Sequence, residues 1–240
     1  MKFTCDICKN NECEFDYENR CKHNVHKSYF ERCWFEREEN NTCFYCTPLL
    51  SACRNGNFDD FVKSVELGAD IHCLFRYGQI APLFIAYDNG NFGIVNKFIE
   101  LGVDINFENE WGITLLHKAC EDGNFDIVNK LIESGADIHC ETKFERETPL
   151  FLACKNGNLA IVNKLIELGA DIHCESKYEE KTALFIACEH GHFDIVKKLI
   201  ELGADIHYKD NEGNTPLQIC LSNNHNELSK LLKELGAQCE

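Results

Sequence analysis

The 240-residue sequence has no long hydrophobic run, no apolar leader and no excess of basic residues. None of its apolar stretches approaches the roughly 20 residues that cross a bilayer. Its first residues, MKFTCDICKN, do not form the apolar segment of a signal peptide. The formal net charge is -16, whereas nucleic-acid binding depends on clustered lysine and arginine. We therefore expect a soluble, intracellular and cytoplasmic protein whose partner is neither a membrane nor a nucleic acid.

Methionine and proline are also scarce, with one and four residues, but there are 16 cysteines. Seven of the cysteines lie within residues 1–46, and the other nine are spread through the repetitive remainder. A secreted disulfide framework would require an export signal, which these first residues do not form. Reduced thiols and thiolate–metal bonds are the better interpretation.

A repeated unit fills residues 47–240. Two of its six copies read TPLFLACKNGNLAIVNKLIELGADIH and TALFIACEHGHFDIVKKLIELGADIH, and equivalent glycines recur every 33 or 34 residues. A period of this length is typical of stacked helix-pair arrays. Within one unit, Thr148 and Pro149 predict the start of a first helix that ends at Gly157. A second helix with an apolar stripe then ends at Gly169, and a polar hairpin follows.

These motifs closely resemble those of the ankyrin repeat family. The resemblance implies a mainly α fold, a solenoid of six helix-pair repeats with hairpin tips in residues 47–240. The cysteine-rich residues 1–46 are expected to form a separate small module. The resemblance also implies a monomer that binds a protein target on a concave face and has no catalytic residues. The histidine of the TPLH motif is kept only as His117, while Phe151 and Phe185 take its place in later repeats. A glutamate recurs at one position of every second helix, which predicts a solvated ridge.

The hairpin tips are the candidate partner-binding surface, because they differ between repeats and carry aromatic residues among charges. Exposed aromatic side chains are preferred anchors of protein interfaces. Packing of these rings tip against tip is an equally reasonable interpretation. The candidate partner-binding residues are Tyr77, Trp111, Phe144, Tyr178, Tyr208, Glu145 and Glu179.

Residues 1–46 hold a set of candidate zinc ligands. Two CxxC pairs, CDIC and CFYC, flank a central CKHNVH motif. Each CxxC turn can direct two thiolates at one tetrahedral ion, so eight ligands predict two zinc ions as the cofactor. The ligands are Cys5, Cys8, Cys21, His23, His26, Cys33, Cys43 and Cys46, with Cys13 as an alternative to Cys33.

The order of these ligands resembles that of the RING finger in its two-histidine variant. The resemblance implies that Ile7 and Trp34 contact a ubiquitin-conjugating enzyme, so that the protein is a RING-type ubiquitin ligase. The family's proline after the seventh ligand and basic residue after the eighth are replaced by Phe44 and Thr47. These departures favour the alternative, an ankyrin scaffold whose zinc module is only a structural cap.

The join between the two parts contains no linker, since Cys46 is followed at once by TPLL. We therefore expect the zinc module to pack rigidly against the first repeat. The abundance of Asn, Ile, Lys and Glu resembles that of ankyrin proteins from AT-rich genomes, including giant DNA viruses. That resemblance would place the protein in a host-cell cytoplasm.

Overall fold

The computed structural model describes residues 46–72 and 81–238, and these are almost entirely helices and turns. The chain divides between Val103 and Asp104 into two compact units. In the described part of the chain, the only β-pairing is a single antiparallel bridge between Glu175 and Thr182. None of the helices in these ranges is long and apolar enough to cross a membrane. The predicted mainly helical fold is confirmed.

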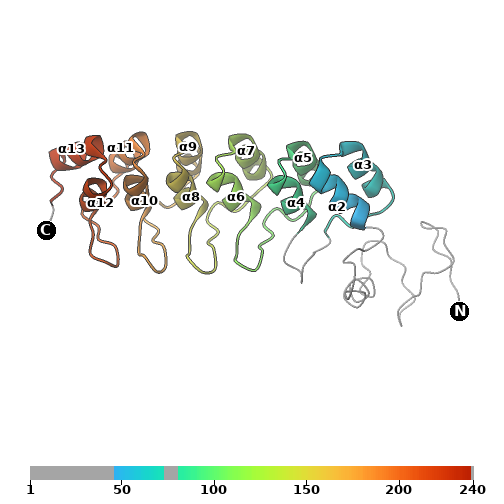
Figure 1. Ribbon diagram of the computed structural model, residues 1–240, viewed down its shortest axis with the longest axis horizontal. Helices are drawn as coiled ribbons and strands as arrows, with labels where there is room; N and C mark the ends of the chain where they lie inside the picture. Colours follow the sequence, from blue (N-terminus) through green and yellow to red (C-terminus); the bar gives the residue numbers. More distant parts are fainter. Residues whose placement is uncertain (1–45, 73–80, 239–240) are drawn as a thin grey trace, which may run out of the picture. The chain divides into compact units, whose positions relative to one another are not determined.

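The described part of the first unit contains two helix pairs (Figure 1). They are α2 (Cys46–Asn55) with α3 (Phe58–Glu66), and α4 (Pro82–Asp88) with α5 (Phe92–Glu100). The rings of Phe61 and Phe98 pack in a T-shaped arrangement with their centroids 4.8 Å apart, and this contact joins the second helices α3 and α5. Helix α2 begins at Cys46, two residues before the start that the Thr–Pro pattern predicts. Pro48 fits there because the amides of a first turn have no helical acceptor.

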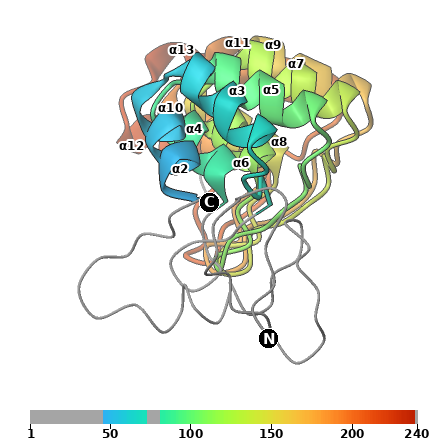
Figure 2. The ribbon, with the colours of Figure 1, turned by 90° about the vertical axis from the view of Figure 1, so that its right-hand side faces the viewer.

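The second unit contains four helix pairs. They are α6 (Leu115–Glu121) with α7 (Phe125–Glu133), α8 (Pro149–Asn156) with α9 (Leu159–Glu167), α10 (Ala183–His190) with α11 (Phe193–Glu201), and α12 (Pro216–Ser222) with α13 (Asn226–Glu234). First helices pack on neighbouring first helices, and second helices pack on neighbouring second helices. The loops between pairs extend beyond the first helices, away from the second helices (Figures 1 and 2).

The helix boundaries follow the predicted signals. The side-chain oxygen of Thr148 accepts a hydrogen bond from the backbone N–H of Phe151, and Thr182 caps α10 in the same way. Gly157 ends α8 with a φ of 82°, in the left-handed conformation that favours glycine. Short helices of seven to nine residues depend on such caps and on packing, because they are marginal in isolation.

The core of the second unit consists of the apolar stripes of both helix layers. Leu165, Val162 and Leu199 are fully buried in the second-helix layer. The first-helix cysteines Cys120, Cys154 and Cys188 are also fully buried. Burial raises the pKa of the thiols of Cys120 and Cys154, so both stay neutral and pack as small apolar groups.

In the last three repeats, the side chain before the second helix bonds to the preceding repeat. The amide nitrogen of Asn158 donates to the backbone oxygen of Gly123 at 3.0 Å, while its side-chain oxygen caps α9. At the next junction, Nε2 of His192 bonds to the backbone oxygen of Lys155 at 3.0 Å. A Cβ at Gly157 would clash with this imidazole, so glycine permits the close approach as well as the turn.

Candidate functional site

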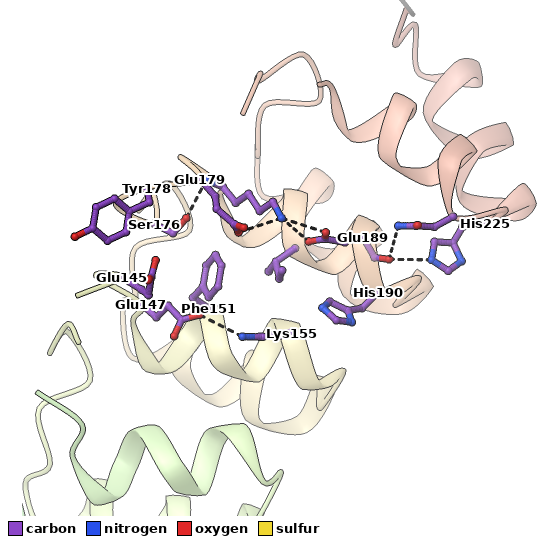
Figure 3. Close-up of a pocket in the computed structure, with 13 residues that line it drawn as sticks. Glu145, Glu147, Phe151, Lys155, Ser176, Tyr178, Glu179, Glu189, His190 and His225 are labelled. Carbon is purple, nitrogen blue, oxygen red and sulfur yellow. Dashed lines mark hydrogen bonds and ion pairs between the residues drawn. The ribbon is translucent and has the colours of Figure 1, made fainter. Parts of the chain in front are cut away.

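A groove of about 930 Å³ opens on the second unit, where two successive loops meet the first helices (Figure 3). The loops contribute Glu145, Glu147, Ser176, Tyr178, Glu179 and Lys181. The first helices contribute Phe151, Lys155, Ile186, Glu189 and His190, and the last repeat adds Asn223 and His225. The groove therefore spans three consecutive repeats.

The floor of the groove is apolar. Phe151 and Ile186 face it from α8 and α10, and both are buried. Phe151 occupies the repeat position that holds His117 one repeat earlier. A phenylalanine there leaves uncharged surface at the bottom of the groove, where a histidine would have bonded to the adjacent loop.

A compensated charge cluster crosses one wall of the groove. The ammonium nitrogen of Lys181 lies 3.1 Å from a carboxylate oxygen of Glu179 and 3.0 Å from one of Glu189. Only 13% of the Lys181 side chain is exposed. Burial alone would lower the pKa of Lys181, but its bonds to Glu189 and Glu179 outweigh burial and raise it. Lys181 is therefore a fixed cation within the wall.

The opposite wall carries a second ion pair and an unpaired acid. Lys155 pairs with Glu147 at 3.4 Å. Among the described residues, no cation pairs with the carboxylate of Glu145, whose backbone oxygen accepts a bond from the amide of Lys177 at 2.7 Å. That bond joins the two loop tips and brings Glu145 beside Tyr178 at the mouth of the groove (Figure 3).

Tyr178 is an exposed aromatic side chain at this mouth. Its exposed fraction is 54%, and the Lys177 ammonium lies 5.1 Å from the ring centroid. This distance is within the range for a cation–π interaction. The ring therefore already attracts a cation at the point where the groove meets solvent.

Histidines line the far end of the groove. The rings of His190 and His192 stack with their centroids 6.0 Å apart. Burial lowers the pKa of His190. Nε2 of His225 and the side-chain amide of Asn223 both bond to the backbone oxygen of Glu189 at 3.0 Å. These bonds fix the last repeat against the end of α10.

The two loop tips beside the groove carry side chains where other tips have glycine. Arg146 and Glu180 adopt left-handed backbone conformations with φ of 55° and 51°. Gly112 and Gly213 hold the equivalent tips on either side, with φ of 73° and 82°. Residues with a Cβ are strained in this region, and such strain tends to gather at functional sites.

The structure brings three of the predicted partner-binding residues, Glu145, Tyr178 and Glu179, into one groove. Trp111 and Phe144 lie outside its lining, with exposed fractions of 51% and 55%. Within the described residues, no ring contact joins Trp111, Phe144 and Tyr178 to one another.

The other two predicted tip aromatics, Tyr208 and Tyr77, are not among the exposed rings of the described loop tips. Tyr208 is half-buried, and burial together with a hydrogen bond to Glu175 raises its pKa to about 12. Its hydroxyl group is therefore already engaged within the protein. Tyr77 lies outside the described residues.

The predicted zinc ligands and the predicted enzyme contacts Ile7 and Trp34 fall outside the described residues, apart from Cys46. The backbone of Cys46 begins α2. Within residues 46–72 and 81–238, no group of three or more His, Cys, Asp or Glu side chains is placed to hold a metal ion. The predicted metal centre in residues 1–46 stays a prediction.

Sequence reasoning missed Lys181, Ile186 and His225 as parts of the groove. Lys181 precedes its partner Glu189 by eight residues, and Lys155 follows its partner Glu147 by eight residues. This spacing joins a loop to the end of the following helix, and it was the available signal. That His225 lies at the groove could not be predicted, because it depends on how the last repeat packs on the one before it. The sequence of one repeat does not specify this packing.

Comparison with known proteins identifies the repeats. A family profile described as ankyrin repeats in three copies matches residues 83–176 and 150–240. Together the two matches cover well over half of the chain. No curated protein sequence matches it at a significant level.

Proposed function

Because the chain belongs to the ankyrin repeat family, whose members generally bind proteins, we propose that it recruits a target protein through the groove of its second unit. The groove that spans three repeats carries this proposal. It combines a buried apolar floor, fixed ion pairs and an exposed tyrosine at its mouth. Sites that bind protein segments commonly combine apolar surface with a few placed polar groups.

Selection of random displayed peptides on the full-length protein tests the groove. Peptides that are enriched on the natural protein should lose binding to a variant in which Ile186→Glu puts a charge on the groove floor. A second variant, Glu147→Lys, reverses charge on the wall without entering the core. The same peptides should still bind the control variant Glu167→Gln, which changes the exposed face of α9. Equal binding to all variants would place the binding surface elsewhere.

For the amino-terminal segment, we propose a RING-like module of residues 1–46 that binds two zinc ions. The donor set of thiolates and imidazoles suits Zn²⁺. Cys5, Cys8, His26 and Cys33 would hold one ion, and Cys21, His23, Cys43 and Cys46 the other. A chain segment this short has too small a core to fold well alone, so zinc would supply much of its stability. Native mass spectrometry should show two zinc ions per chain, and a zinc-free protein would contradict the proposal.

The module would act as a ubiquitin ligase by holding a conjugating enzyme at Ile7 and Trp34 while the groove holds the target. No residue of this chain would act as a nucleophile, because the contribution is proximity and orientation. Ubiquitination assays with a panel of conjugating enzymes should show chain formation that Ile7→Ala abolishes. Chain formation that is unaffected by Ile7→Ala would contradict this role.

Phe44 and Thr47 support a second candidate function, an ankyrin scaffold in which the zinc module only caps the first repeat. They stand where active RING ligases carry a proline and a basic residue. Under this alternative, no conjugating enzyme of the panel supports chain formation, although zinc is still bound. The two assays together separate the ligase from the scaffold.

A further inference from the structure

We propose that the segment held in the groove is basic, and that it places an arginine between the carboxylate of Glu145 and the ring of Tyr178. This inference rests on the proposed function, because it names the partner of the same groove. The occupant is a short extended segment of a target protein, with arginine at the mouth and an uncharged side chain over the floor. Three observations support this chemistry.

The first observation is the charge balance of the groove. Its lining contains four glutamates and two lysines. The lysines are engaged with glutamates of the lining, Lys181 with Glu179 and Glu189, and Lys155 with Glu147. Within the described part of the chain, Glu145 is left without a cation, at the mouth rather than inside. A basic side chain of the partner would pair with the Glu145 carboxylate, whereas an acidic side chain would be repelled by it.

The second observation is the cation that already lies over Tyr178. The Lys177 ammonium is 5.1 Å from the ring centroid, yet more than half of the tyrosine remains exposed. A guanidinium is planar and weakly hydrated, so it stacks on an aromatic face and binds a carboxylate at the same time. Arginine therefore fits the pair of Tyr178 and Glu145 better than lysine does.

The third observation is the rigid placement of this pair. The backbone bond from Lys177 to Glu145 fixes one loop tip against the next. On the far side, the amides of Asn211 bond to the backbone oxygens of Glu179 at 3.1 Å and Tyr178 at 2.6 Å. Tyr178 is thus held between two neighbouring loops. Because these bonds already fix the backbone of the pair, partner binding has to order only the two side chains.

Fluorescence anisotropy with defined probes tests this proposal. One labelled peptide alternates arginine with leucine, a second replaces each arginine by lysine, and a third replaces each arginine by glutamate. At about 0.15 M salt, the full-length protein should bind the arginine peptide most tightly and the glutamate peptide least. Glu145→Gln and Tyr178→Leu should each weaken arginine-peptide binding about threefold, and their combination about tenfold.

Matched controls remove the same charge at a different place. Glu133→Gln and Glu167→Gln change exposed glutamates on α7 and α9, so each reduces the net negative charge as Glu145→Gln does. Each should change arginine-peptide affinity less than about twofold, since these side chains are only part of a screened surface field. Tyr178→Leu keeps apolar area but removes the π face, and Tyr178→Trp should preserve or increase affinity.

Two results would overturn the arginine site. In the first, the control variants Glu133→Gln and Glu167→Gln weaken binding as much as Glu145→Gln does. That result would mean that the peptide is attracted non-specifically to an acidic protein. In the second, the glutamate peptide binds as tightly as the arginine peptide. If displayed peptides require the groove but lack basic residues, the proposed function stands and this inference fails. If no displayed peptide requires the groove, the proposed function itself fails.

Discussion

The repeat that contains His117 and the next two repeats use one structural position in opposite ways. His117 is fully buried, and its Nδ1 accepts a bond from the backbone N–H of Thr114 at 3.1 Å. Its Nε2 therefore carries the proton and donates to the backbone oxygens of Cys140 and Glu147, each at 3.2 Å. Phe151 and Phe185 make no such bonds, but they add buried apolar surface, and Phe151 faces the groove. The comparison shows that this family position can hold a loop in place or form the floor of a groove.

The largest expected effect comes from replacing His117, the polar residue of this comparison, by the phenylalanine that the next two repeats carry. His117→Phe should lower the free energy of unfolding by about 3 kcal/mol. The N–H of Thr114 and the backbone oxygen of Cys140 lose their bonds to the imidazole, and the backbone oxygen of Glu147 keeps only the bond from Thr142. Phe151→Leu, an apolar change at the equivalent position, should cost only about 1 kcal/mol. Urea unfolding followed by circular dichroism measures both. Equal losses for the two variants would contradict the distinct roles.

The junctions between repeats extend the comparison to the second helices. Asn158 both caps α9 and bonds to the preceding repeat, whereas His192 makes only the bond to the preceding repeat. Asn158→Ala should lower the free energy of unfolding by about 1.5 kcal/mol. His192→Asn should lie within about 0.5 kcal/mol of the natural protein, since a gained cap offsets any change in the bond. A large loss from His192→Asn would mean that the imidazole has a role of its own.

Measuring the free energy of unfolding against pH sharpens the comparison, because His117 can take up a proton and Phe151 cannot. Burial lowers the pKa of His117 below its ordinary value, despite hydrogen bonds to Glu147 and Cys140 that raise it. As pH falls through about 6.5, the unfolded chain therefore takes up the proton first, and the folded protein becomes less stable. This loss continues down to the lowered pKa of His117 and then stops.

The control for this titration is His117→Gln. Gln218 already occupies the equivalent position in the last repeat, where its side-chain oxygen accepts the backbone N–H of Thr215 at 2.7 Å. Glutamine should keep the cap while removing the titration, so stability should depend less on pH in this range. His190 also has a pKa lowered by burial and supplies a remaining slope. An unchanged pH dependence in His117→Gln would exclude His117 as a source.

The smallest expected effect concerns the strained tips beside the groove. Glu180→Gly should raise the free energy of unfolding by about 0.5 kcal/mol, because glycine adopts the left-handed conformation without steric cost. Gly213→Ala, at the equivalent tip of the next loop, should lower it by about 1 kcal/mol. Its added Cβ would meet no atom within 4 Å, so the backbone conformation alone decides the result. Thermal unfolding of the two variants against the natural protein measures the difference.

Much of the fold could be predicted from the sequence, because each repeat carries its own local signals. The threonine caps, left-handed glycines and apolar stripes appear where they were predicted, as at Thr148, Gly157 and Val162. The start of α2 was missed, since a Thr–Pro pair marks a favourable start without preventing an earlier one. Local signals determine where helices end, and they repeat in every unit.

The groove was predicted only in part, because its contacts cross from one repeat to the next. Glu145, Tyr178 and Glu179 were found as non-repeating tip residues. The double pairing of Lys181 was missed, because the eight-residue spacing signals Glu189 alone and does not show that packing also brings Glu179 to 3.1 Å. The same reason hid His225, which bonds to the backbone of the preceding repeat.

Hydrogen exchange of the full-length protein, with and without a groove-selected peptide, tests the central claim most directly. If the groove is the binding surface, the peptide should slow amide exchange in the two loop tips, residues 141–147 and 175–181. Exchange in the second helices α9 and α11, which contribute no residue to the groove, should be unchanged. Protection confined to α9 and α11, with both tips unaffected, would contradict the claim that this protein holds its target in the groove.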